Sequence, residues 1–122
     1  MRYNAYIEIE FDPNSLNKIS DILGVKANKH INGNWIYFIS IDEGDDWINF
    51  YDVFHNILKD KIQILYQELK IIKEQINIWL VLEYEGQCNF EINPNDLAKL
   101  SSLEVTLCVS CYQGKLSKRV FS

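Results

Sequence analysis

The chain is poor in the residues that mark unusual protein classes, because its 122 residues include only two prolines and five glycines. Collagen-like and low-complexity chains need far more of both, so these classes are excluded. Hydrophobic residues make up 48% of the chain, which is enough to bury a core and excludes intrinsic disorder. The length fits a single domain, which we expect to cover residues 1–114, followed by a polar and basic tail over residues 115–122.

Long hydrophobic runs are also missing. The longest apolar run, around residues 78–82, is far short of the roughly 20 residues that a membrane-spanning helix needs. The first residues, Met1 to Asn4, do not open a signal peptide. The three cysteines are few and odd in number, which fits a reducing compartment better than a disulfide framework. We therefore expect a cytoplasmic protein.

Basic residues are outnumbered, since 12 Lys and Arg face 17 Asp and Glu, giving a net charge of −5 and a pI near 4.9. Such a chain repels polyphosphates and anionic lipid on average. Nucleic acid and membrane are therefore not expected as partners, whereas a basic or neutral protein remains compatible with the charge.

Strands are predicted where hydrophobic and polar residues alternate with a period of two. This pattern covers residues 3–11 and 76–84. A short aromatic and β-branched stretch at residues 35–41 predicts a further strand, inside the sheet. Gly86 and Gln87 favour a hairpin turn into a strand at residues 88–92, and the last strand is expected at residues 103–112.

Helices are predicted from capping residues and from apolar residues at helical spacing. Asp12 and Pro13 begin one helix that Gly24 ends, and Asn93 and Pro94 begin another. Apolar residues recur every three or four positions from Trp47 to Ile72, which predicts one long core helix. Residues 26–34 are expected to form a loop.

The two proline-capped segments resemble one another, since residues 12–20 match residues 93–101 in cap, proline, apolar spacing, lysine and serine. Each segment follows a predicted strand and precedes another. We therefore expect an α+β two-layer sandwich: a mostly antiparallel sheet of about five strands with helices on one face, built from two strand–capped-helix–strand units joined by the long helix. Chance use of a common proline cap is the alternative.

The candidate chemical motifs are better explained as structural features. Cys108 and Cys111 have the spacing of a redox pair or half a zinc site, but three steps along a strand place them on opposite faces. The acidic residues at 42–46 lack the ligand spacing of a calcium loop and fit a solvated helix start. Neither His30 nor His55 has a nucleophile at a telling spacing. We therefore assign no catalytic residue, no metal site and no cofactor.

The side of the sheet opposite the helices is the surface best suited to act. The alternation along the strands places carboxylates and large aromatic side chains on this side, together with Thr106 and Ser110. Exposed aromatic residues can anchor a partner while the charge steers a basic surface towards them. The alternative is an ordinary solvated sheet face, or one covered by the tail or by a second copy. The predicted partner-binding residues are Tyr6, Glu8, Glu10, Trp79, Glu83, Glu85, Glu104 and Tyr112.

The order of these features resembles the bacterial domain-of-unknown-function family 4279. The resemblance rests on the Asp-Pro start and Leu23-Gly24-Val25 end of the first helix, on Gly33, on Trp47 and the helix after it, on Phe90-Glu91-Ile92 before Asp96, Leu97 and Leu100, and on the closing strand to Tyr112. It implies a small bacterial domain without an established activity. An immunity-type inhibitor encoded beside a toxin is one expectation that the resemblance carries.

Three hypotheses of function follow. The first is a binding protein, an immunity-type inhibitor that covers a basic protein such as a toxin with its acidic and aromatic sheet face. The second is a small-molecule-binding or enzymatic domain with a cleft between the long helix and the sheet, using His55 or the acidic residues 42–46. The third is a homodimer formed by pairing sheet faces, in place of a monomer.

Overall fold

The computed structural model describes residues 1–114 as one sheet with a helical layer. The strands are β1 (Arg2–Ile9), β2 (Lys29–Ile31), β3 (Asn34–Ile41), β4 (Ile76–Tyr84) and β5 (Thr106–Gln113). The helices are η1 (Pro13–Ser15), α1 (Leu16–Leu23), α2 (Phe50–Leu58), α3 (Ile62–Leu69), η2 (Lys73–Gln75) and α4 (Pro94–Leu103). The basic tail predicted for residues 115–122 lies outside the described residues.

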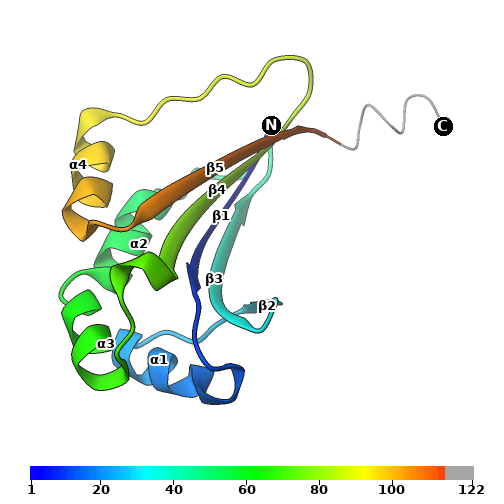
Figure 1. The fold of residues 1–122 in the computed structure, drawn as a ribbon. Coiled ribbons are helices and arrows are strands. Elements are labelled where there is room, and N and C mark those ends of the chain that lie inside the picture. Colours follow the sequence, from blue (N-terminus) through cyan, green and yellow to red (C-terminus); the bar gives the residue numbers. More distant parts are fainter. Residues whose placement is uncertain (115–122) are drawn as a thin grey trace.

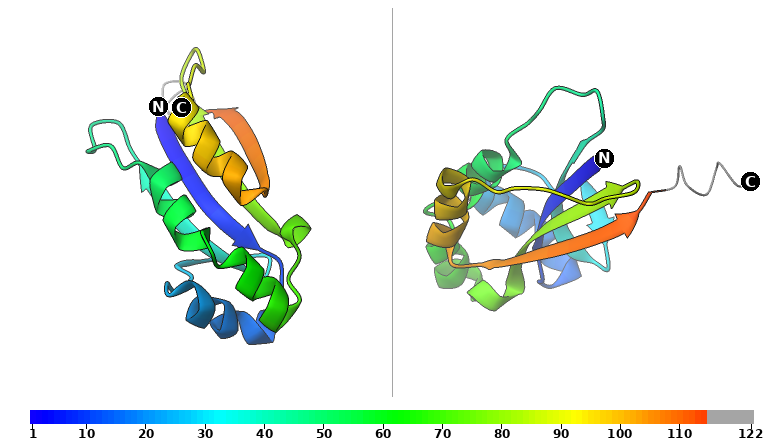
Figure 2. Two further views of the ribbon diagram at one scale, coloured as in Figure 1. Left: turned by 90° about the vertical axis from the view of Figure 1, so that its left-hand side faces the viewer. Right: turned by 90° about the horizontal axis from the view of Figure 1, so that it is seen from above.

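The sheet has the strand order β2-β3-β1-β4-β5. All neighbouring strands run antiparallel except β4 and β5, which are parallel. The four α-helices lie on one side of this sheet, as the view from the side shows (Figures 1 and 2). The predicted α+β class and mostly antiparallel five-stranded sheet are therefore confirmed.

The core lies between the sheet and the helices. Every second residue of β1 and β4 points into it, and Ile7, Ile9, Ile76 and Leu82 are completely buried. Burying a side chain of this size stabilises the fold by roughly 1.5–3 kcal/mol. The period-two pattern of both strands thus follows from having helices on one face only.

Both proline-capped helix starts are confirmed. The side chain of Asp12 accepts a hydrogen bond from the backbone N–H of Asn14, and that of Asn93 accepts one from Asp96. Pro13 and Pro94 occupy the first helical turn, where the missing N–H costs nothing. Gly24 ends α1 in the left-handed conformation, with φ of 75°.

The predicted single long helix is wrong, because the segment forms α2 and α3 with a break at Asp60, whose φ is 62°. The first of these helices begins at Phe50, since Asn49 caps it by accepting a hydrogen bond from the N–H of Asp52. Trp47 therefore lies in the loop before the helix and is 56% exposed. The break lets α2 and α3 each turn an apolar face towards the core, with Phe54 and Leu65 completely buried.

The loop predicted for residues 26–34 contains a strand. β2 pairs antiparallel with β3 through a tight turn at Asn32 and Gly33, whose φ angles are 53° and 75°. Two consecutive positive φ angles are what a type I′ hairpin turn requires, and the Asn-Gly pair suits it.

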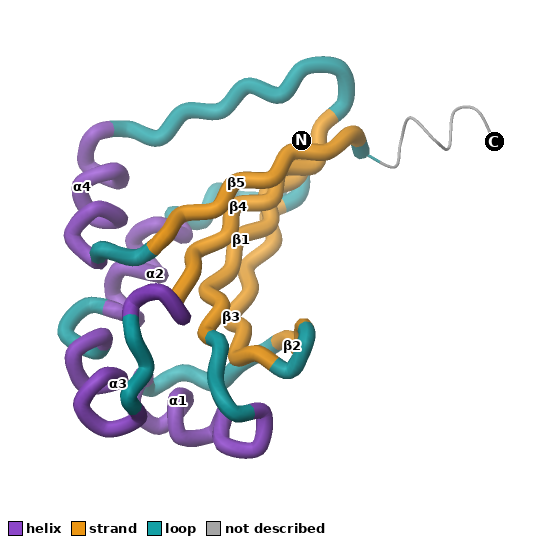
Figure 3. The backbone as a smooth tube through the Cα atoms, in the orientation of Figure 1, coloured by secondary structure: helices purple, strands orange, loops and turns teal. Residues whose placement is uncertain are grey.

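The strand predicted for residues 88–92 is also wrong. These residues form a connection that runs back beside the sheet from β4 to α4 (Figures 1 and 3). The place beside β4 is taken by β5, which offers eight residues for pairing where the predicted strand had five. The hairpin predicted at Gly86 is therefore replaced by a helical crossover between parallel strands.

Candidate functional site on the open sheet face

Within residues 1–114, α1 to α4 all lie on one side of the sheet, and none of them covers the opposite face (Figure 3). Because side chains alternate along a strand, this open face takes Tyr6 and Glu8 from β1 and Trp79 and Glu83 from β4. The strand register aligns its side chains in rows that run across the sheet. We refer to this surface as the open face.

An aromatic row crosses the middle of the open face. Tyr6 lies opposite Phe38 of β3 on one side and opposite Trp79 on the other. The ring of Tyr6 stacks on that of Trp79 with 6.0 Å between centroids and 17° between planes, and the ring of Phe38 lies 6.1 Å away. The Nζ atom of Lys29 lies 3.9 Å from the centroid of Phe38. All three rings are half-buried, so each presents a surface to solvent while its position is fixed by neighbours.

Glu8 is held beside this row by two hydrogen bonds. The indole N–H of Trp79 donates to Oε1 of Glu8 at 3.0 Å, and Nδ2 of Asn34 donates to Oε2 at 3.2 Å. The pKa of Tyr6 is raised by burial and, secondly, by the Glu8 carboxylate. The pKa of Cys108, which lies opposite Trp79, is raised for the same two reasons. The arrangement fixes one carboxylate against an aromatic surface.

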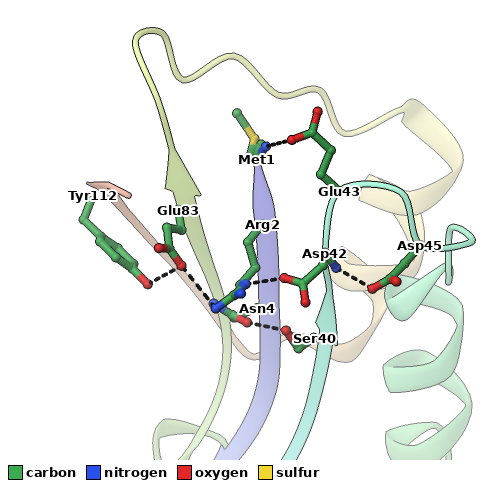
Figure 4. A network of polar contacts seen from close by, with 9 residues as sticks. All are labelled: Met1, Arg2, Asn4, Ser40, Asp42, Glu43, Asp45, Glu83 and Tyr112. Atoms are coloured by element: carbon green, nitrogen blue, oxygen red, sulfur yellow. Dashed lines mark hydrogen bonds and ion pairs between the residues drawn. The ribbon is translucent and has the colours of Figure 1, made fainter. Parts of the chain in front are cut away.

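A network of charged and polar side chains lies at one end of the open face (Figure 4). The Arg2 guanidinium pairs with Asp42 and also lies 3.5 Å from Oε2 of Glu83. The hydroxyl of Tyr112 donates to Glu83 at 3.2 Å. The pKa of Arg2 is raised mainly by its hydrogen bond with Asp42, and that of Tyr112 is raised by burial and by Glu83. Glu83 is therefore engaged within the protein and does not act as an isolated surface charge.

Between the aromatic row and the charged network, Ser40 donates a hydrogen bond to Oδ1 of Asn4 at 2.7 Å (Figure 4). The exposed acidic loop over residues 42–46 follows β3 at the same end of the sheet. Asp45 accepts the backbone N–H of Asp42 at 2.8 Å, and Glu43 lies 3.8 Å from the Met1 amine. This end of the open face thus carries an excess of carboxylates.

The structure brings together five of the eight predicted residues: Tyr6, Glu8, Trp79, Glu83 and Tyr112 share the open face, as their positions in the register require. Thr106 and Ser110 also share this face.

The other three predicted residues lie elsewhere. Glu10 and Glu85 are exposed and lie just beyond the ends of β1 and β4. The placement of Glu104 on the sheet is wrong, because this residue ends α4 in the left-handed conformation and pairs with Lys73 at 2.5 Å. The predicted last strand began too early, since α4 continues to Leu103.

Sequence reasoning missed the β3 contribution to the open face. Phe38 and Ser40 point there, and so does Ile36, which is completely buried although it faces away from the helices. The signal was present, because Trp35, Tyr37 and Ile39 alternate with these residues and face the core. Assigning the two faces of this strand by parity would have found them.

The cleft expected between a long helix and the sheet is filled by side chains. Phe50, Phe54 and Leu58 of α2 are each at most 2% exposed there. His55 points elsewhere and lines an open surface hollow together with Lys59, Gln63, Lys73 and Ser102.

Two of the three cysteines, Cys108 and Cys111, lie in β5. Cys108 is opposite Trp79 on the open face, whereas Cys111 is opposite Leu82, whose side chain is in the core. The prediction that this pair occupies opposite faces is confirmed. Cys88 lies in the connection after β4, and the pKa of its thiol is raised by burial first and by the neighbouring Cys111 second.

Within residues 1–114, no three histidine, cysteine or acidic side chains gather closely enough to hold a metal ion. The helices of this same described range are too short or too polar to cross a bilayer.

Comparison with protein-family models, with curated proteins and with solved structures finds no match for this chain. The resemblance to family 4279 stays a prediction. Any functional proposal for the chain therefore rests on the geometry of the open face.

Proposed function

We propose that this chain is a protein-binding domain whose open face binds a partner with a basic surface. An immunity-type inhibitor of a toxin is the form of this function that the family resemblance implies. The single observation that carries the proposal is the row of half-buried aromatic rings of Phe38, Tyr6 and Trp79, held on a sheet with a fixed carboxylate beside it.

The aromatic row has the properties of an interface centre. Aromatic side chains on rigid strands supply contact area at little conformational cost, and tryptophan and tyrosine are enriched among the residues that dominate binding energy. The stacked rings of Tyr6 and Trp79 also offer π faces on which a guanidinium or ammonium group can rest. Lys29 already makes such a contact with Phe38 inside this protein.

Glu8 gives the row a preference for cations. A carboxylate can accept about four hydrogen bonds, and the indole of Trp79 and the amide of Asn34 supply two of them. The remaining acceptor positions suit an arginine or lysine that stacks on the neighbouring rings. Because the carboxylate is held in place before binding, little ordering cost remains when the partner arrives.

The net charge of the domain favours the same partner. Three of the 12 basic residues follow residue 114, so residues 1–114 hold nine basic and 17 acidic residues, a net charge of −8. The exposed acidic loop 42–46 and Glu85 lie near one end of the sheet, where they can steer a basic protein towards the open face. Glu83 contributes less to steering because Arg2 lies beside it.

The experiment is a capture of partners from the cells that produce the protein, with the wild type and with Trp79→Ala as bait, each washed at low and at high salt. We expect a stoichiometric basic protein on the wild type that is lost at high salt and is absent from the Trp79→Ala bait. The captured protein is then purified, and its affinity for both baits is measured directly.

The matched control is Tyr66→Ala, which removes an aromatic side chain that is 50% exposed on α3, on the helical side. This variant should retain the partner. Equal loss of the partner from both variants would contradict a site on the open face, and a partner of acidic character would contradict the proposed chemistry.

A further inference from the structure

A hollow lies on the helical side of the sheet, at the end where β1 begins. It is lined by Tyr3 and by four residues of the connection between β4 and α4, Cys88, Asn89, Phe90 and Glu91. In the views of Figure 2, the start of β1 lies between the loop 42–49 and this connection. The hollow has a volume of about 690 Å³, within the range of roughly 300–1,000 Å³ that is typical of ligand pockets.

Tyr3 joins the hollow to a cluster of aromatic rings. The ring of Tyr3 meets that of Trp47 edge to face, with 5.2 Å between centroids and 88° between planes. Trp47 lies 5.6 Å from Phe50, and Phe50 lies 4.4 Å from Tyr51. The lining residue Phe90 adds a ring that is 36% exposed. Rings of this kind pack against methylene groups and attract cations to their faces.

The charge around the hollow is negative. Among the lining residues, Glu91 carries a carboxylate and none has a basic side chain. The Cys88 thiol stays neutral, because burial raises its pKa. The exposed acidic loop 42–46 lies at the same end of the sheet, and the Arg2 guanidinium there pairs with Asp42. This end therefore repels an anionic ligand and attracts a cationic one.

A buried hydroxyl near Tyr3 has unused hydrogen-bonding capacity. Tyr51 is only 5% exposed, and its hydroxyl makes no hydrogen bond within residues 1–114. In that range every fully buried side-chain oxygen has a partner, so the Tyr51 hydroxyl is in contact with solvent. Burial, then the charge of Asp96 and then Tyr3 raise the pKa of Tyr51 to about 12, which keeps the hydroxyl protonated.

Asp96 places a second carboxylate near this hydroxyl. Its side chain is 9% exposed in the first turn of α4. Nδ2 of Asn49 donates to its Oδ1 atom at 3.4 Å, and Nζ of Lys99 lies 3.9 Å from the same atom while pairing with Asp52. Oδ2 of Asp96 accepts no hydrogen bond within residues 1–114 and is available to a donor.

We propose that this hollow binds a small organic ammonium compound. Its methylene groups pack on the rings of Tyr3 and Phe90, and its ammonium group pairs with Glu91. The hydroxyl of Tyr51 accepts a further N–H from the ligand. The inference is independent of the open-face function, because the hollow lies on the opposite side of the sheet.

An NMR titration of the wild type with n-pentylamine tests the proposal. The matched probes are n-pentanol and pentanoate, which keep the length of the chain and remove or reverse its charge. We expect saturable shifts of the backbone amides of residues 88–91 with a millimolar dissociation constant. Binding of n-pentanol and of pentanoate should be weaker by roughly tenfold or more.

Tyr51→Phe separates ligand binding from stability. The hydroxyl that it removes makes no hydrogen bond in the free protein, so the free energy of unfolding should stay the same or rise. The dissociation constant of n-pentylamine should rise by about threefold to tenfold. Tyr66→Phe is the matched control, since this tyrosine is 50% exposed on α3 and does not line the hollow. It should change neither quantity.

Glu91→Gln tests the charge of the hollow. It should weaken binding of n-pentylamine by about fivefold or more, whereas Glu68→Gln at an exposed position of α3 should not. Trp79→Ala should bind the amine as the wild type does, which separates this site from the aromatic row of the open face.

Several outcomes would overturn the proposal. These are the absence of saturable shifts, shifts confined to the open face around Tyr6 and Trp79, equal binding of the three probes, and equal effects of a variant and its matched control.

Discussion

The two proline-capped units of this protein begin alike and are completed differently. In the first unit, β1, α1 and β2 follow one another, and in the second β4, α4 and β5 do. β2 runs in the same direction as β1, since each is antiparallel to β3, just as β5 runs parallel to β4. Both units therefore consist of two parallel strands connected by a helix, but only in the second unit are these two strands neighbours in the sheet.

The difference comes from the segment after each helix. The Asn32-Gly33 turn lets the first unit add β3, which inserts between β1 and β2 and leaves only three residues for β2 at the edge. The second unit has no such turn before residue 114 and keeps a long edge strand. The comparison teaches that a repeated helix cap fixes where a helix begins, whereas the following turn decides which strands become neighbours.

The largest expected effect comes from the strand that only the first unit has. Trp35 of β3 is completely buried, and its indole N–H donates to Oγ of Ser20 in α1 at 2.9 Å. Trp35→Ala should lower the free energy of unfolding in urea by about 3–5 kcal/mol. Leu107→Ala, at a half-buried site in β5, should cost only about 1–2 kcal/mol. Equal losses of unfolding free energy in the two variants would contradict the view that β3 makes the first unit more stable than the second.

Substitutions at the C-terminal ends of α1 and α4 should change the stability of the protein in opposite directions. Gly24 and Glu104 both end their helices in the left-handed conformation, with φ of 75° and 56°. Gly24→Ala should destabilise the protein by about 1 kcal/mol because a side chain is strained there. Glu104→Gly should stabilise it by up to about 1 kcal/mol, less the small contribution of the exposed pair with Lys73. Thermal unfolding measures both, and changes of the same sign would contradict this account.

Removing the N-cap side chain should cost more stability at α4 than at η1. Asn93 caps α4, which has ten residues, whereas Asp12 caps only the three-residue η1 that precedes α1. Asn93→Ala should cost about 1 kcal/mol and Asp12→Ala about 0.5 kcal/mol in urea unfolding. The reverse order would indicate that the first cap organises more than its own turn.

The smallest effect concerns pH and only the second unit. The hydrogen bond and charge of Lys73 lower the pKa of Glu104 below its ordinary value. A carboxyl group whose pKa is depressed by folding adds stability above its unfolded pKa, and this stability is lost as pH falls through the folded pKa. A carboxyl titration by NMR should find a lowered pKa for Glu104 that rises towards the ordinary glutamate value in Lys73→Gln. An unchanged pKa in that variant would remove Lys73 as the cause.

Much of the fold follows from local patterns in the sequence. The alternation in β1 and β4 reports one buried face, and the Asp-Pro and Asn-Pro pairs report helix starts, because both signals depend on residues close in the chain. The break at Asp60 was missed, since neither glycine nor proline marks it and the apolar spacing continues across it. The strand predicted at residues 88–92 failed because which strand joins β4 depends on competition with β5, which lies further along the chain.

The candidate site was predictable to the same extent. Parity placed Tyr6, Glu8, Trp79, Glu83 and Tyr112 on one face, but it could not show that Glu83 is paired with Arg2 or that Trp79 donates to Glu8. Those contacts depend on the register between distant strands. The error at Glu104 has a local origin, because a left-handed glutamate at a helix end leaves no mark in the sequence.

The central position of β1 in the sheet determines the order in which its strand pairs can form during synthesis. β1 precedes both of its neighbours, β3 and β4, in the chain, and Glu8 meets Trp79 from 71 positions away. Its pairing with β3 can form first, whereas its pairing with β4 must wait until residues 76–84 have been made. The sheet can thus be completed only after β4 and β5 have been made, and a nascent chain that stops before residue 84 lacks part of the pairing between β1 and β4.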